Sequence, residues 1–176
     1  MKKLALFGWG LALTLSLAAC DGTPPGTTDS NADDSASGSR SAVGLADPFI
    51  ECHTIEEAIA QAGFPFALPS TPDGYEQKSI SVVKGELISV IFENAHGEQL
   101  CLRKGIGERD VSGDFNRYDE TRTAVIDGIT ITLKGNGDTM NLATWSAAGF
   151  SYSASSSAGL SEGALLDLVR PMVEAS

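Results

Sequence analysis

The sequence is poor in basic residues and histidine, and each shortage argues against a class of function. It carries 12 Lys and Arg against 23 Asp and Glu, a formal net charge of −11 at pH 7. A nucleic-acid-binding surface needs clustered Lys and Arg to contact phosphates. The sequence has no such cluster, so nucleic acid is not an expected partner. His53 and His96 are the only histidines, which leaves few candidates for acid–base catalysis.

Long apolar runs are also lacking. The longest, residues 4–19, covers roughly 16 residues, whereas a membrane-spanning helix needs roughly 20. Two lysines precede this run, and the letters LAAC at residues 17–20 close it, as in a bacterial lipoprotein signal peptide. The pattern predicts a signal peptide over residues 1–19, cleavage before Cys20, and acyl chains such as palmitate on this cysteine. An ordinary secretory signal whose cysteine is incidental is the alternative.

Lipid on Cys20 decides the expected location of the protein. Two or more acyl chains hold a protein stably on a membrane, whereas one chain does not. We therefore expect a lipoprotein of the cell envelope, anchored in the cell membrane on its extracytoplasmic face.

Residues 20–46 carry almost no large apolar side chains and are rich in Ser, Asp, Gly, Thr and Pro. Such a composition cannot bury enough surface to offset the entropy of ordering, so we predict a disordered linker after the lipidated cysteine. A glycosylated or partner-binding tail is the alternative. Residues 47–176 remain, a length that suits a single compact domain.

Cysteine is scarce, with three in the chain. Once Cys20 is lipidated, Cys52 and Cys101 form an even pair in a compartment where disulfides persist. The expectation is one disulfide bond, which would close a loop of about 49 residues and stabilise the fold by roughly 4 kcal/mol in the chain-entropy model. Two buried free thiols, or one reactive thiol, are the alternatives.

Two helices are predicted near the ends of the domain. Thr54 and Glu57 form a capping box ahead of apolar residues at helical spacing, so a helix is expected over residues 55–62. Ser161 would cap a second helix with one apolar stripe facing the core. The stripe consists of Leu165, Leu166, Leu168, Val169, Met172 and Val173.

Between the helices, apolar residues recur with period two, which predicts strands. The expected strands cover residues 75–83, 87–93, 99–104, 123–126, 129–134, 140–146 and 150–154. Asp127-Gly128 predicts a type I′ turn. No strand is followed by a crossover helix, which argues against a parallel sheet. The predicted class is α+β: a curved antiparallel sheet of about six or seven strands, with the two helices packed on one face.

The short motifs that resemble catalytic signatures lack the structural context that catalysis would require. Ser81 and Lys84 match S-x-x-K, but on a strand positions three apart point to opposite faces. Ser151 lacks the second glycine of a nucleophile elbow, and neither His53 nor His96 has a sequence context that positions it against a nucleophile. No catalytic residue, cofactor or enzyme activity is therefore assigned.

The polar segment 105–121 collects oxygen-bearing side chains of the kind that calcium prefers. They are Asp110, Ser112, Asp114, Asn116, Asp119 and Glu120. The EF-hand pattern fails, because Phe115 falls at its glycine position and Thr121 at its final glutamate position. A solvated loop is the preferred interpretation, and no metal site is assigned.

Aromatic residues make up only 7% of the chain. Four of them are candidates for the lining of a groove that binds sugar or peptide: Tyr118, Trp145, Phe150 and Tyr152. Aromatic residues on adjacent strands are more often core residues or cross-strand pairs. Both interpretations stay open at the level of the sequence.

Several short motifs occur in order along the domain. They are DPF at 47–49, EEA at 56–58, AGF at 62–64, GY at 74–75, SGDFN at 112–116, ATW at 143–145, SYS at 151–153 and GLS at 159–161. Over most of residues 47–173 the chain resembles exported bacterial proteins that carry the domain of unknown function 4367. These are turn and packing residues, so the resemblance implies a fold more than a chemistry, and it brings no catalytic residues.

These observations favour a membrane-anchored, extracytoplasmic lipoprotein that acts as a non-catalytic binding module. The expected partners are the membrane, through the lipid on Cys20, and an envelope protein, peptide or glycan. An envelope stress, signalling or assembly factor is the alternative function. A hydrolase with an unrecognised site comes third.

Overall fold

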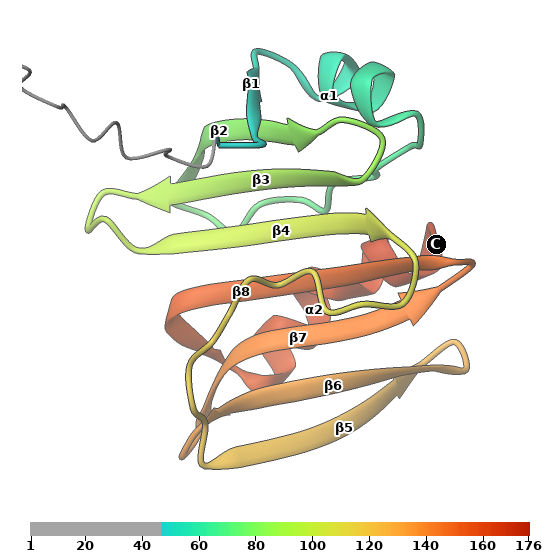
Figure 1. Ribbon diagram of the computed structural model, residues 1–176. Coiled ribbons are helices and arrows are strands. Elements are labelled where there is room, and N and C mark those ends of the chain that lie inside the picture. Colours follow the sequence, from blue (N-terminus) through green and yellow to red (C-terminus); the bar gives the residue numbers. More distant parts are fainter. Residues whose placement is uncertain (1–46) are drawn as a thin grey trace, which may run out of the picture. The chain divides into compact units, whose positions relative to one another are not determined.

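The structure, a computed structural model, describes residues 47–176. Eight strands form one antiparallel sheet, accompanied by two helices (Figure 1). The elements are β1 (Ile50–Cys52), α1 (Ile55–Ala62), β2 (Tyr75–Val83), β3 (Leu87–Asn94), β4 (Gln99–Ile106), β5 (Glu120–Ile126), β6 (Ile129–Asn136), β7 (Thr139–Ala147), β8 (Phe150–Ser161) and α2 (Glu162–Glu174). The predicted signal peptide, Cys20 and the predicted linker lie outside the described residues.

The α+β class is confirmed, but the sheet has eight strands and not six or seven. Their order is β1-β2-β3-β4-β8-β7-β6-β5, and the sheet is open, with β1 and β5 at its edges. The strand that the sequence did not reveal is β1, which places Cys52 opposite Ile80 of β2. Its three residues are too few for an alternating pattern to stand out.

Both helices begin where the sequence predicts, because their caps are encoded locally. The Thr54 hydroxyl accepts a hydrogen bond from the Glu57 amide at 3.2 Å, and the Ser161 hydroxyl accepts one from the Ala164 amide at 3.2 Å. Each bond satisfies an amide that the helix itself leaves without a partner. Gly63 ends α1 in the left-handed conformation, with φ of 81°.

The pairing of β4 with β8 joins two halves of the sheet that are distant in sequence. Leu102 of β4 lies opposite Ala154 of β8. Between them the chain leaves β4, crosses one face of the sheet as residues 107–119, and enters β5 at the far edge (Figure 1). It then returns strand by strand through β6 and β7. The connection 107–119 is therefore held against a sheet face and not at an edge.

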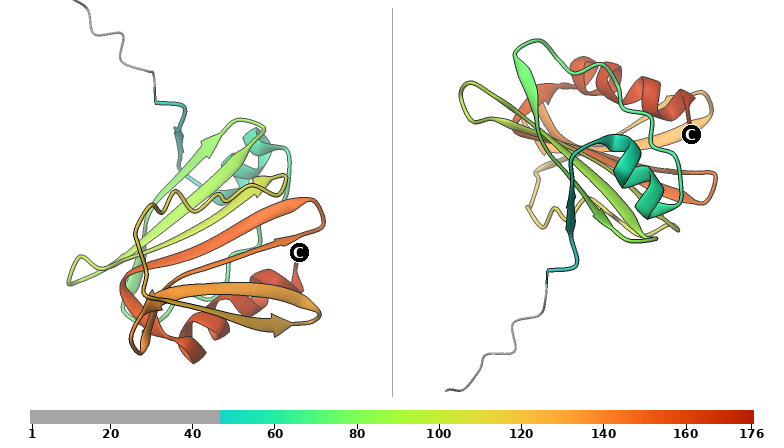
Figure 2. Two further views of the ribbon diagram at one scale, coloured as in Figure 1. Left: turned by 60° about the horizontal axis from the view of Figure 1, so that its bottom comes forward. Right: turned by 90° about the horizontal axis from the view of Figure 1, so that it is seen from above.

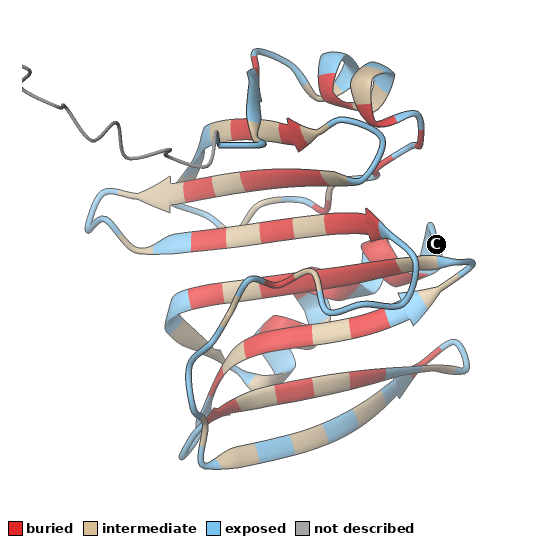
Figure 3. Cartoon of the chain, in the orientation of Figure 1, coloured by how far each residue is buried: buried red, intermediate tan, exposed pale blue. Residues whose placement is uncertain are grey.

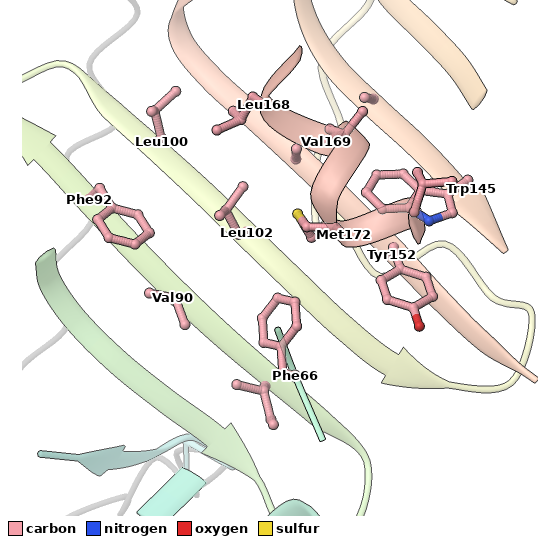
Figure 4. Close-up of a cluster of buried hydrophobic side chains, with 14 of the residues drawn as sticks. Phe66, Val90, Phe92, Leu100, Leu102, Trp145, Tyr152, Leu168, Val169 and Met172 are labelled. Carbon is pink, nitrogen blue, oxygen red and sulfur yellow. The ribbon is translucent and has the colours of Figure 1, made fainter. Parts of the chain in front are cut away.

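The hydrophobic core lies between the sheet and the helices, and α2 covers it on one side of the sheet (Figure 2). Buried and less buried residues alternate along β4 and β6 (Figure 3), as expected when successive side chains point to opposite faces, whereas residues 151–154 of β8 are all buried. Figure 4 shows the side chains of Leu168, Val169 and Met172 from α2 among those of the sheet. Leu166, predicted to be part of the same stripe, is only partly buried. Within residues 47–176, no helix is long and apolar enough to cross a membrane.

Candidate functional site

The face of the sheet opposite the core is rich in small polar side chains. Ser151, Ser153 and Ser155 of β8 alternate with the core-facing Tyr152 and Ala154, and lie opposite Gly105, Arg103 and Cys101 of β4. On the other side of β8, Ser146 and Thr144 of β7 continue the row. We call this surface the polar face. It is the face that the connection 107–119 crosses.

Arg103 fastens this connection to the sheet. Its Nη1 donates to the carbonyl oxygens of Ser112 at 2.6 Å and Val111 at 3.3 Å, while its Nε donates to the Ser89 hydroxyl at 3.1 Å. A planar guanidinium suits this task because it presents several donors in a fixed fork. Ser89 is 2% exposed, so the contact between Arg103 and the sheet is buried.

The acidic side chains of the connection are used for its own turns. The Ser112 amide donates to Asp110 Oδ1 at 2.8 Å, and the Asn116 amide donates to Asp114 Oδ1 at 2.8 Å. The Tyr118 hydroxyl donates to the other oxygen of Asp114. Burial, followed by this bond to Asp114, raises the pKa of Tyr118. Carboxylates bonded in this way shape the turns of the connection.

The oxygen-bearing side chains of the segment 105–121 do not gather around one point as the ligands of a metal ion would. Asp119 instead donates its amide to Asn136 Oδ1 at 3.0 Å, and Glu120 accepts from Arg122 at 3.0 Å. Among the residues that the structure describes, no three His, Cys, Asp or Glu side chains are grouped as a cation would require.

Beside the connection, the polar face is hollowed. The hollow has a volume of about 380 Å³ and lies where the start of β4, the end of β6, the start of β7 and the middle of β8 meet the segment from Asp114 to Tyr118. Its lining is dominated by amide and hydroxyl side chains. They include Gln99, Asn116, Tyr118, Asn136, Asn141, Ser155 and Ser157. We call this set the polar hollow.

An exposed aromatic ring stands next to the polar hollow. Phe115 is 95% exposed, although a phenylalanine ordinarily gains stability from burial. It lines a second, more open depression that shares Gln99, Asn116 and Ser155 with the polar hollow. An apolar platform therefore adjoins a set of hydrogen-bonding groups on one surface.

The four aromatic residues considered for a groove do not form one. Trp145 and Tyr152 are 4% and 3% exposed, and their rings stack in the core at 5.1 Å between centroids with 4° between planes (Figure 4). Strand alternation explains this, because both residues occupy core-facing positions of neighbouring strands. Phe150 packs against Phe64 at 5.1 Å. Tyr118 alone lines the polar hollow.

The disulfide expected between Cys52 and Cys101 is not formed in this structure, where both are free thiols. Cys52 is on β1 and Cys101 on β4, with two strands between them. At about 4.8 Å per strand the separation is roughly 14 Å, about twice the limit for a disulfide. Cys52 also faces the core, whereas Cys101 lies on the polar face.

The histidines and serines considered for catalysis are kept apart. His53 and His96 are exposed, and neither lines the polar hollow or the depression beside Phe115. Ser81 lies within β2, and the hydroxyl of Ser151 donates to the Gly107 carbonyl at 2.9 Å. The last bond is another contact that ties the start of the connection to the sheet.

A buried lysine was not anticipated from the sequence. Lys104 is 6% exposed, and its Nζ donates to the Pro65 carbonyl at 2.8 Å. The same nitrogen lies 4.3 Å from the ring centroid of Phe150 and 5.1 Å from that of Tyr152. Burial lowers the pKa of Lys104. Strand alternation could have predicted its burial, because Lys104 lies on the same face of β4 as the core residues Leu100 and Leu102.

Comparisons with protein-family models, with curated proteins and with solved structures found no match to this chain.

Proposed function

We propose that this chain is a non-catalytic binding module of the cell envelope, and that the polar hollow beside Phe115 binds an envelope glycan. The observation that supports the proposal is the union of an exposed ring with amides and hydroxyls on one surface. In this proposal a lipid on Cys20 holds the module at the extracytoplasmic side of the cell membrane.

The chemistry of the lining favours a sugar over a highly charged ligand. An amide side chain has two N–H donors and a carbonyl acceptor, and a hydroxyl both donates and accepts from one atom. Gln99, Asn136 and Asn141 each use one such group within the fold, and the groups that remain can match the hydroxyl groups of a sugar. The charged groups in the lining, Asp114 and Arg117, are of opposite sign. The ring of Phe115 would cover the apolar face of a sugar, which adds contact area without a charge.

The ligand test compares the secreted chain with matched variants. The chain from residue 20 onward, with Cys20→Ser and without the predicted signal peptide, carries no lipid, and its binding to soluble glycan fragments of purified bacterial cell wall is measured by calorimetry. Phe115→Ala should weaken binding about tenfold, which corresponds to roughly 1.4 kcal/mol. Asn116→Ala should also weaken it. Val125→Ala removes another exposed apolar side chain, 68% exposed on β5, and should leave binding unchanged.

Two outcomes would contradict the ligand assignment. The first is no measurable binding of any glycan fragment by the folded protein. The second is binding that Phe115→Ala and Asn116→Ala leave intact, which would place the ligand elsewhere.

The anchoring part of the proposal has its own test. Labelled palmitate should be incorporated into the wild-type chain in bacteria and not into a Cys20→Ser variant. Equal labelling of both chains, or of neither, would reject lipid attachment at this residue and leave the glycan assignment to be judged separately.

A further inference from the structure

The two edges of the sheet differ in how they are protected. At one edge, β1 has only three residues and follows Pro48. At the other edge, β5 has seven residues that pair with β6 without a bulge. Proteins usually protect an edge with short strands, proline, lysine or bulges, because its free backbone groups can pair with another chain. Within Glu120–Ile126 there is no proline, lysine or bulge, and Arg122, on the core-facing side, is paired with Glu120 and Glu162 at 3.0 Å.

The turn after β5 fixes which backbone groups face outward. Ile126 and Ile129 flank Asp127-Gly128, whose φ values of 48° and 81° match a type I′ turn. Residues that flank such a turn form a hydrogen-bonded pair, and bonded and non-bonded pairs alternate from there. Val125, Thr123 and Thr121 therefore occupy non-hydrogen-bonded pairs. Their N–H and C=O groups point away from β6, toward the free edge.

The same three residues have exposed side chains on the polar face. β-branched side chains at alternate positions suit cross-strand pairing with a neighbour. On the other face Ala124 is partly buried against the core, so an added strand could extend the core beside it.

Charge selects the kind of partner. Asp119 precedes β5 and Asp127 follows it, and both are exposed. If a second copy paired antiparallel about Thr123, Asp119 of each copy would oppose Asp127 of the other, because both are four residues from Thr123. Like charges placed opposite one another destabilise a pair. A segment with basic ends would instead meet an acid at each end of β5.

We propose that the β5 edge binds an extended segment of another protein, with Lys or Arg at both ends and β-branched residues between, added as a ninth strand. This surface is distinct from the polar hollow and does not depend on the glycan assignment. Main-chain hydrogen bonds would supply affinity and the terminal acids would supply selectivity, as in other cases of strand addition.

The test uses a labelled peptide with two lysines at each end and alternating Val and Thr between them, titrated into the Cys20→Ser chain. Thr123→Pro removes one outward N–H without removing a β5–β6 hydrogen bond, since proline is tolerated where the amide faces solvent. It should weaken binding about tenfold or more by the loss of the amide and the blocking of strand approach. Thr123→Val keeps the amide and should bind within about twofold of wild type.

The charge argument is tested in the same assay. Asp119→Asn with Asp127→Asn should weaken binding at least about threefold and flatten its salt dependence. A peptide with glutamates in place of the lysines should not bind. Phe115→Ala should change nothing, which separates this surface from the proposed glycan site.

Amide hydrogen exchange keeps the proposal testable if Thr123→Pro fails to fold. In the wild-type chain, the peptide should protect the amides of Thr121, Thr123 and Val125, while those of Arg122 and Ala124 are protected already by β6. The proposal is overturned if the lysine peptide does not bind, if a folded Thr123→Pro variant binds normally, or if these three amides stay unprotected. Self-association of the peptide-free chain through β5 would overturn the choice of a basic partner.

Discussion

At the scale of the residue, Lys104 is a cationic side chain that is buried in apolar surroundings. An ammonium group buried among Phe64, Phe150 and Tyr152 has one carbonyl partner, that of Pro65. The rings offset part of the cost of desolvation through their negative faces. Burial lowers the pKa of Lys104, because it penalises the charged form of the amine.

The pH dependence of stability should therefore reveal Lys104. Because its pKa is lower in the folded chain than the ordinary 10.5, the unfolded chain binds more protons between the two values, and stability rises with pH there. Below the folded pKa the cost of the buried charge is present in full. Relative to Lys104→Met, the wild type should gain free energy of unfolding as pH rises toward the ordinary pKa of 10.5.

Chemical denaturation of both proteins across this range provides the measurement. Other titrating groups largely cancel in the difference between the two chains. A constant difference, or one that favours the variant more at high pH, would show that the lysine is not destabilised by burial.

Arg103 shows the opposite use of a cation, since its Nε bonds the sheet and its Nη1 bonds the connection. Arg103→Met should leave the sheet folded and loosen residues 107–119, because two carbonyl groups and the Ser89 hydroxyl lose their donor. Trypsin should then cut after Arg109 or Arg117 several-fold faster than in the wild type, as seen by mass spectrometry. Arg103→Lys keeps the charge without the planar fork and should give intermediate protection. Unchanged cleavage in both variants would mean that other contacts hold the connection.

At the scale of the element, local signals predicted the helices well. Thr54, Glu57 and Ser161 act on amides only three or four residues away, so their effect can be inferred from sequence. β1 was missed because it is defined by pairing with β2 and not by its own pattern. Trp145 and Tyr152 carry an alternation that fits either face of a sheet, and only the position of α2 decides which face is the core.

Helix α2 allows a sharper test of which predicted stripe residues stabilise the fold. Leu165 is fully buried, whereas its neighbour Leu166 is only partly so. Leu165→Ala should cost about 2–5 kcal/mol through lost contacts and a residual cavity. Leu166→Ala should cost less than half as much, since less of its surface leaves water on folding.

Thermal unfolding of the two variants gives the comparison directly. A loss of 1 kcal/mol lowers the midpoint of a domain this size by about 3–5 °C, so the two substitutions should differ clearly. Equal shifts would mean that α2 is rotated relative to the structure described above.

At the scale of the whole molecule, the pairing of β4 with β8 explains why the polar hollow could not be predicted from the sequence. Its lining comes from four strands and the connection, and these meet only after residues around Leu102 and Ala154 pair across the chain. No local pattern encodes such a pairing, because alternation is compatible with several strand orders. The sequence therefore predicts strands and faces, but not which polar ends converge.

The same long-range arrangement keeps Cys52 and Cys101 apart within residues 47–176, so no disulfide joins them there, and this can be measured. The Cys20→Ser chain, denatured without reductant, should show two free thiols, Cys52 and Cys101. In the native state Cys101 should react with a thiol reagent well before Cys52, because Cys52 is buried, and burial together with the charge of Glu57 raises the pKa of its thiol. The unfolding midpoint should be the same with and without reductant, since no loop of the unfolded chain is closed. Absent thiols and a lower midpoint on reduction would require Cys52 and Cys101 to be brought together, and hence a different strand order from β1 to β4.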